Sequence, residues 1–128
     1  MKKICVWSGP RNVSTAFMYS FSQREDTIVV DEPLYGHYLR ISGAKHPGRH
    51  EIMQKINCDG NEVMRILMAQ KSLHHKILFL KQMCHHLQRI NRDFLLKTDN
   101  IFLIRDPKEV LPSLTKQLPN VSIRDTGL

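Results

Sequence analysis

Four short apolar runs, each ending abruptly in polar, Gly or Pro residues, constrain the fold more than any other feature of the sequence. They cover residues 4–7, 27–30, 76–80 and 100–104. None shows the regular apolar–polar alternation of a strand with one wet face, and segments of helical character separate them. The pattern predicts an α/β fold, in which helices cover both faces of a parallel sheet to give three layers.

The segments between and after these runs have either helical character or the composition of a loop. Residues 43–60 mix Gly, Pro, His, Lys and Arg, which predicts a long loop. Pro112 must fall in the first turn of the last helix or kink it, because proline has no backbone N–H to donate. One helix is predicted to begin at Ser14, and three more are predicted over residues 62–68, 84–90 and 109–118.

The chain carries an excess of positive charge. Nineteen Lys and Arg residues against twelve Asp and Glu give a formal net charge of +7. Such a charge favours an anionic partner, which could be a nucleotide, a nucleic acid or an acidic polymer. A basic surface that serves only solubility is the alternative. Charge does not choose among these, so the choice depends on finding a specific phosphate site.

Cysteine content and the N-terminal sequence indicate a reducing compartment. Cys5, Cys58 and Cys84 are an odd number at wide spacings, which argues against a disulfide framework or a zinc site. The first apolar stretch is too short for a secretion signal, and no run approaches the roughly 18 apolar residues of a membrane span. Since repeats and linker-like runs are absent, we predict a single cytoplasmic domain over residues 1–128 with no membrane association.

The loop after the first apolar run has the features of a phosphate site. Residues 8–15 read Ser-Gly-Pro-Arg-Asn-Val-Ser-Thr and join a strand to a helix, so backbone N–H groups can converge on an anion. Arg11 adds a permanent positive charge, and Ser14 and Thr15 add hydroxyl donors. The loop is not the NTPase motif, because Ser14 stands at its second glycine and Thr15 at its lysine. A plain strand-to-helix turn with Ser14 as N-cap is the alternative.

The fourth apolar run leads into a second candidate phosphate element. Arg105 follows the run directly, and Ser113 comes eight residues later, about two turns into the next helix. One anion could therefore contact both. The alternative is an ordinary strand exit in which Asp106 caps the helix and Pro107 is its first residue.

Residues 7–15 resemble the 5′-phosphosulfate loop of sulfotransferases, and the Arg105–Ser113 pair resembles their 3′-phosphate motif. Arg11 stands where cytosolic members usually carry lysine, a difference shared with bacterial and carbohydrate-directed members. The resemblance implies a P-loop nucleoside triphosphate hydrolase-like fold and 3′-phosphoadenosine 5′-phosphosulfate as the cosubstrate. It also implies two separate cationic pockets, around Arg11 and Arg105. The implied binding residues are Gly9, Pro10, Arg11, Asn12, Val13, Ser14, Thr15, Arg105 and Ser113.

The resemblance extends to about residue 113, whereas family members continue with further strands and helices. The chain is therefore expected to be an incomplete, truncated form of the fold, of uncertain activity, with apolar surface exposed at the missing edge. The acceptor is expected to offer a hydroxyl or an amine. Sugar, steroid, phenol and small metabolite all stay open, because loops such as 43–60 would set the choice.

Candidates for the chemistry follow the second and third apolar runs. The Asp-Glu-Pro sequence at Glu32 resembles the Glu-Pro element of bacterial sulfotransferases, which implies that Glu32 is the general base, while a surface carboxylate paired with Arg40 or another surface cation is the alternative. Lys81 matches the lysine of a Lys-Thr-His element and is expected to assist the sulfuryl group, unless it is an ordinary solvated lysine. Met83 replaces the histidine of that element, so His85, or His86 beside it, is the rival base.

Three other interpretations carry less support. The acidic end of the second run could bind a metal ion in a nucleotide kinase or NTPase, but the Gly-Lys-[Ser/Thr] sequence is missing. A non-catalytic basic module that binds RNA or an acidic polymer lacks an RNA-binding motif and a basic stripe, so no nucleic-acid partner is expected. The pairs at 74–75 and 85–86 would align on a helix, but the run between them favours a strand and no ligand set is complete, so no metal is expected.

Overall fold

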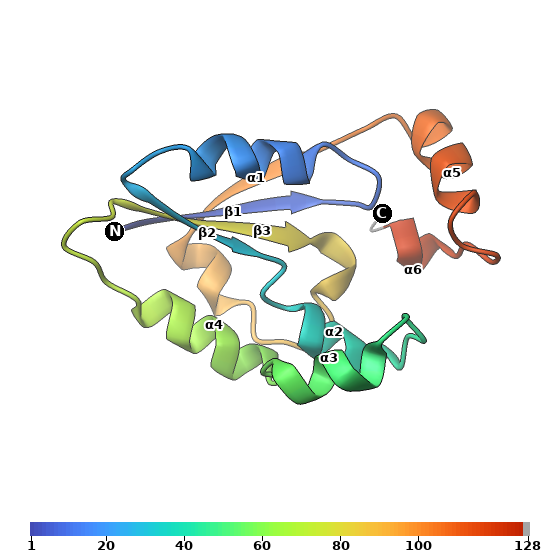
Figure 1. Cartoon of the computed structure of the whole chain (residues 1–128), viewed down its shortest axis with the longest axis horizontal. Helices are drawn as coiled ribbons and strands as arrows, with labels where there is room; N and C mark the ends of the chain where they lie inside the picture. Colours follow the sequence, from blue (N-terminus) through green and yellow to red (C-terminus); the bar gives the residue numbers. More distant parts are fainter. Residues whose placement is uncertain (127–128) are drawn as a thin grey trace.

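A four-stranded parallel sheet forms the centre of the described chain, which comprises residues 1–126 apart from the side chain of Arg124 in this computed structural model. The strand order is β2-β3-β1-β4 (Figure 1). All four predicted runs are strands, so the predicted α/β class with a parallel sheet is confirmed. Their bounds are β1 Lys2–Ser8, β2 Thr27–Asp31, β3 Ile77–Met83 and β4 Asp99–Leu103.

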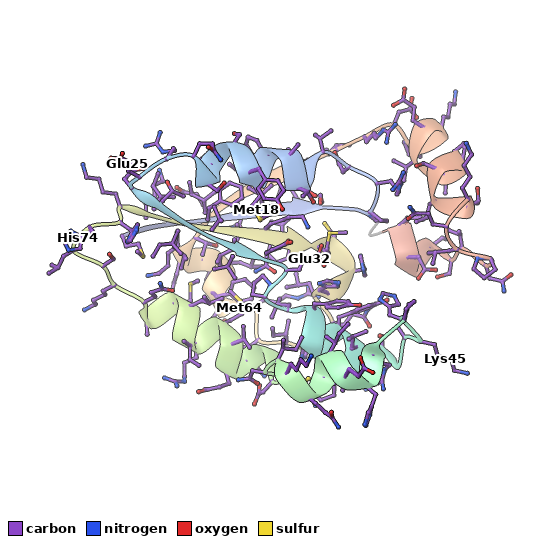
Figure 2. All side chains as sticks on the ribbon, in the orientation of Figure 1. Met18, Glu25, Glu32, Lys45, Met64 and His74 are labelled. Atoms are coloured by element: carbon purple, nitrogen blue, oxygen red, sulfur yellow. The ribbon has the colours of Figure 1, made fainter. Side chains whose placement is uncertain are left out.

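Helices lie on both faces of the sheet. Helix α1 (Ser14–Ser22) covers one face and α4 (Gly60–Ala69) the other (Figure 1). Met18 of α1 packs with Ile4 and Phe79, whereas Met64 of α4 packs with Trp7 and the opposite side of the same strands. Figure 2 shows the two methionines on opposite sides of the sheet. Two-sided burial is the reason that the runs of β1 and β3 lack alternation in sequence.

Two segments differ from the prediction. Residues 43–60 are not one long loop, since α3 (Arg49–Lys55) forms within them after Gly48, whose φ of 70° allows the turn before the helix. Residues 84–90 are not a helix beyond the single 3-10 turn η1 (Cys84–His86). Arg89 has a φ of 47°, which a continuing α-helix does not accommodate. Helix α2 (Tyr35–Ser42) and the 3-10 turn η2 (Asp93–Lys97) were not predicted.

The C-terminal part contains α5 (Pro107–Thr115) and α6 (Ile123–Thr126). Asp106 caps α5 by accepting a hydrogen bond from the Lys108 N–H at 2.9 Å, with Pro107 in the first turn. The capping described in the alternative interpretation of this element is therefore present. The helix is shorter than predicted at its end, and Pro112 lies inside it rather than in its first turn. At the β4 edge Phe102 is 63% exposed.

The parallel arrangement brings the carboxyl ends of all four strands to one edge. The loop after β1, Glu32 after β2, η1 after β3 and Arg105 after β4 therefore lie near one another. Figure 1 shows α5 and α6 beside the same edge, and Figure 2 shows Glu32 there. The candidate site is at this edge.

Candidate functional site

The loop between β1 and α1 is held in a defined shape by its own side chains. Arg11 has a φ of 58°, in the left-handed region that non-glycine residues rarely adopt. Asn12 accepts a hydrogen bond from the Val13 N–H at 2.8 Å and donates another to the Leu103 carbonyl at 2.9 Å, so the loop is tied to the end of β4. Ser14 is the first residue of α1 and does not cap it, because Val13 occupies the cap position. The alternative interpretation of Ser14 as an N-cap is therefore wrong.

The two predicted phosphate elements meet in one cluster. Arg11 Nε donates a hydrogen bond to Ser113 Oγ at 2.7 Å, and Arg105 donates from an Nη to the Arg11 carbonyl at 2.8 Å. Arg105 also forms an ion pair with Glu109 at 3.2 Å. Residues about a hundred positions apart in sequence are thus in direct contact. We expected two separate cationic pockets, whereas the structure has a single cationic cluster. In it, side chains of the loop after β1 and of the segment after β4 bond one another.

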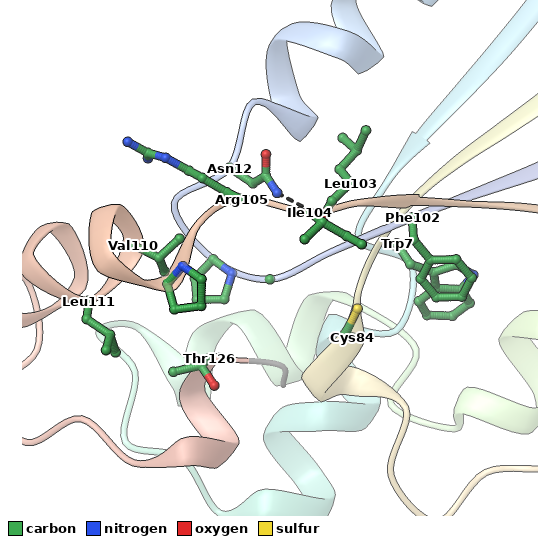
Figure 3. A pocket seen from close by; sticks show the side chains of 13 residues that line it. Trp7, Asn12, Cys84, Phe102, Leu103, Ile104, Arg105, Val110, Leu111 and Thr126 are labelled. Carbon is green, nitrogen blue, oxygen red and sulfur yellow. Dashed lines mark hydrogen bonds between the residues drawn. The ribbon is translucent and has the colours of Figure 1, made fainter.

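A cavity of about 200 Å³ lies beside this cluster (Figure 3). Trp7, Phe102 and Val110 give it apolar walls, while Gly9 and Arg105 bring the loop and the cluster to its border. A side chain at position 9 would collide with the Thr126 carbonyl, so the loop passes there only as glycine. Figure 3 shows Thr126 across the pocket from the hydrogen-bonded Asn12 and Leu103.

The buried Lys81 forms an ion pair with the partly exposed Glu32 at the centre of the edge. Lys81 Nζ donates to Glu32 Oε1 at 2.6 Å and to Asp31 Oδ1 at 2.8 Å, and the lysine side chain is only 5% exposed. Burial by itself would lower the pKa of Lys81, but its hydrogen bonds to Asp31 and Glu32 raise the pKa overall. Lys81 is therefore not a solvated lysine.

The backbone at Glu32 is also unusual and also fixed. Its φ is 44°, its N–H donates to the Lys81 carbonyl at 2.9 Å, and its carbonyl accepts from the Tyr35 N–H at 3.0 Å. Arg40 does not pair with it, because Arg40 donates to the Cys58 carbonyl instead. The predicted alternative of a surface pair with Arg40 is wrong, since the partner of Glu32 is a buried lysine.

Five rings form a cluster next to Glu32. Tyr38 stacks on His86 with centroids 4.7 Å apart and meets His85 edge-on at 4.9 Å, while Tyr35 donates to or accepts from His46 Nδ1 at 2.8 Å. Burial lowers the pKa of His86 to about 2 and also lowers the pKa of His85. Both imidazoles are therefore neutral near pH 7. The two histidines of η1 were predicted site candidates, but the contribution of Tyr35 and Tyr38 of α2 was not predicted. Their i, i+3 spacing, which places both rings on one face of a helix, could have indicated it.

The comparison with known families decides the classification. A family model described as "Sulfotransferase domain" matches residues 1–128, the whole chain. The chain belongs to the sulfotransferase family. Such an enzyme family transfers a sulfonate group and so requires a sulfonate donor. The match agrees with the α/β fold and confirms the resemblance to sulfotransferases.

Two curated proteins of Arabidopsis thaliana are similar to this sulfotransferase domain. The "Branched-chain-amino-acid aminotransferase-like protein 2" is 36% identical over 129 residues, which cover 100% of this chain and 23% of that protein. The "Branched-chain-amino-acid aminotransferase-like protein 1" is 35% identical over 119 residues, which cover 88% of this chain and 20% of that protein. The domain thus spans about a fifth to a quarter of these relatives. No solved structure matches it.

The described residues were also considered as metal ligands and as membrane-spanning helices. Within residues 1–126 there is no group of three or more His, Cys, Asp or Glu side chains that could hold a metal ion. His74 and His75 precede β3, whereas His85 and His86 follow it, so the two pairs lie at opposite ends of a strand. Among the described helices of this sulfotransferase domain, none has the length and apolar character needed to cross a membrane.

Proposed function

We propose that this domain binds 3′-phosphoadenosine 5′-phosphosulfate and transfers its sulfuryl group to a hydroxyl or an amine of an acceptor. The observation that carries the proposal is the contact between Arg11, Ser113 and Arg105 at the phosphate loop. Arg11 and Arg105 bring two positive charges to this loop, and within the described chain only Arg105 of the two has an ion-pair partner, Glu109. A nucleotide with two separate phosphate groups would offer anionic partners to both arginines.

Different residues would bind the two ends of the nucleotide. The loop from Gly9 to Thr15 would hold the 5′ end through its backbone N–H groups, with Arg11 as the fixed cation. Arg105 and Ser113 would hold the 3′-phosphate. Because Arg11 and Ser113 bond each other at 2.7 Å, the phosphates would replace that bond on binding. The apolar cavity beside Trp7 and Phe102 suits the adenine base of the nucleotide.

The carboxylate of Glu32 is the proposed base. When bound, the donor supplies the sulfuryl group, whose transfer forms an S–O or S–N bond to the acceptor while the S–O bond to the 5′-phosphate breaks. Glu32 would accept the proton that the acceptor loses, and Arg11 would stabilise the charge left on the 5′-phosphate. Lys81 holds Glu32 through a bond of 2.6 Å and would assist the sulfuryl oxygens.

His85 is the rival base. Its lowered pKa leaves it neutral and able to accept a proton near pH 7, and it borders the same cavity as Glu32. Glu32 is preferred because its backbone and its carboxylate are both held in place. If His85 were the base, His85→Gln would lower the transfer rate at least as much as Glu32→Gln does.

The ion pair also argues against the kinase alternative. A magnesium site at the end of β2 would need free carboxylates, but Lys81 already bonds both Asp31 and Glu32. Together with the missing Gly-Lys-[Ser/Thr] sequence, this favours sulfuryl over phosphoryl transfer.

Calorimetric titration with adenosine 3′,5′-bisphosphate and, separately, with ATP and magnesium tests the proposal. Arg105→Ala is expected to weaken bisphosphate binding at least about tenfold, since a hydrogen bond to a charged group contributes roughly 1.5–3 kcal/mol. Lys108→Ala removes an exposed cation three residues further on, in the first turn of α5, and is the matched control. Glu32→Ala should bind the nucleotide like the unmodified chain.

Three results would contradict the proposal. Binding of ATP with magnesium alone would indicate the kinase, and binding of neither nucleotide would indicate the non-catalytic module. Loss of bisphosphate binding in Glu32→Ala but not in Arg105→Ala would refute the assigned roles. The cytoplasmic location and the single-domain organisation stay predictions.

A further inference from the structure

A second cavity, of about 290 Å³, opens on the other side of the phosphate loop. Pro10 of the loop and Glu32 border it on one side, and Tyr38 and His86 form part of its wall. It therefore adjoins both the proposed sulfuryl position and the proposed base. Its size suits a compound of one or two rings rather than a polymer.

The charges around this cavity have one sign. Glu32 and Asp125 border it, and among the described side chains that line it none is a lysine or an arginine. The nearest buried ammonium, that of Lys81, is already bonded to two carboxylates. A ligand with a negative charge would therefore meet repulsion without a compensating cation.

Flat rings provide most of the wall. Tyr38 and His86 are stacked at an interplanar angle of 24°, and Tyr35 lies against both His46 and His86 at centroid distances of 5.8 and 5.7 Å. Because the two histidines of η1 are neutral, their ring faces carry no charge. Such a surface favours a flat apolar ring by stacking.

The same wall contains polar atoms without partners. In the described part of the chain, Nδ1 of His85 and Nδ1 of His86 are buried and make no hydrogen bond, and the His86 residue is 1% exposed. An unsatisfied buried polar atom costs roughly 1–3 kcal/mol. Because both nitrogens have almost no accessible surface, the wall that a ligand meets consists of the ring faces.

We infer that this cavity is the acceptor site and that its acceptor is a phenol without negative charge, with the ring against Tyr38 and His86 and the hydroxyl toward Glu32. The inference rests on the proposed function, because it takes the phosphate loop as the source of the sulfuryl group. It adds the class of acceptor and the basis of its selection. The uncharged aromatic wall selects the ring, and the two carboxylates exclude anions.

Two probes of equal size separate charge from shape. Binding of 4-hydroxybenzamide and of 4-hydroxybenzoate would be measured by ligand-observed NMR in the presence of adenosine 3′,5′-bisphosphate. The amide is expected to bind at least about tenfold more tightly than the carboxylate. Equal or tighter binding of 4-hydroxybenzoate would overturn the inference, and so would binding of methyl glucoside in preference to both phenols.

Variants place the probe in the cavity. His86→Leu and Tyr38→Leu each remove a stacking face, and each is expected to weaken 4-hydroxybenzamide binding at least about fivefold. Tyr19→Leu changes an exposed tyrosine of α1 and is the control, expected to leave binding unchanged. Fluorescence of the buried Trp7 reports whether each variant is folded. Unchanged binding in both folded cavity variants would overturn the assignment.

The two proposals fail in different ways. If the bisphosphate binds and neither phenol does, the acceptor inference is wrong and the proposed function stands. If the bisphosphate does not bind, the proposed function itself fails.

Discussion

Acidification is expected to destabilise the fold through one histidine. His86 is 1% exposed, and burial, together with His85 and other nearby basic side chains, lowers its pKa to about 2 from an ordinary 6.5. In the unfolded chain the same imidazole takes up a proton as the pH falls below 6.5, whereas in the folded chain it stays neutral. Its contribution to stability is thus fully present above pH 6.5 and is lost progressively below it.

The size of this loss follows from the two pKa values. At about pH 5 the unfolded histidine is favoured by roughly one and a half pKa units, which corresponds to about 2 kcal/mol. The figure does not depend on the exact folded pKa, because any value well below 5 leaves the folded ring neutral. His85 acts in the same direction, since burial lowers its pKa too. Asp125 also has a lowered pKa, but it affects stability only at a pH below its ordinary pKa of 3.8.

Urea unfolding followed by tryptophan fluorescence measures the effect, because Trp7 is the single tryptophan and is 2% exposed. Between about pH 7.5 and about pH 5, His86→Phe is expected to lose about 2 kcal/mol less stability than the unmodified chain. His74→Gln, at an exposed histidine, should change in parallel with the unmodified chain. If His86→Phe shows the full acid loss, within about 0.5 kcal/mol, then His86 is not the group responsible.

Two further substitutions test the local arguments by the same unfolding assay. Lys81→Met should destabilise the fold by roughly 1–2 kcal/mol, because it leaves the carboxylates of Asp31 and Glu32 without their partner. The loss is limited because both carboxylates are exposed enough to regain some solvation. Lys71→Met, at an exposed lysine, is the control, and equal stability of the two variants would contradict the reasoning. Asp106→Ala should cost about 1 kcal/mol through loss of the α5 cap, while Asp106→Asn, which can still cap, should cost less. Equal losses in the two Asp106 variants would show that the cap contributes nothing.

The sheet could be predicted from the sequence because burial on both faces leaves a simple trace. A strand covered by helices on both sides must be apolar at every position, so residues 77–80 read as one uninterrupted run. The loop after β1 and the cap at Asp106 were also predictable, since both depend on neighbours within a few residues. The positions of Arg11 and Arg105 at one edge then follow from the parallel arrangement alone.

Contacts between distant segments could not be predicted in the same way. Arg11 bonds Ser113 only because α5 returns over the phosphate loop, and no local pattern encodes that return. The alternative of a solvated Lys81 was wrong because the residue lies inside β3, where Asp31 at the end of β2 and the adjacent Glu32 pair with it. The ring cluster of Tyr38 and His86 joins α2 to η1, and α2 itself was not recognised.

The backbone strain at Arg11 and Glu32 supports a role for their side chains. Each adopts a positive φ that costs roughly 1–3 kcal/mol for a residue with a Cβ and almost nothing for glycine. A chain under selection for stability alone would therefore gain from glycine at both positions. Instead the strain is held by bonds from neighbouring segments, from Arg105 to the Arg11 carbonyl and from the Glu32 N–H to Lys81. A cation and a carboxylate kept at such positions, on the same edge, fit the proposed division of work: one for the leaving phosphate and the other for the proton of the acceptor.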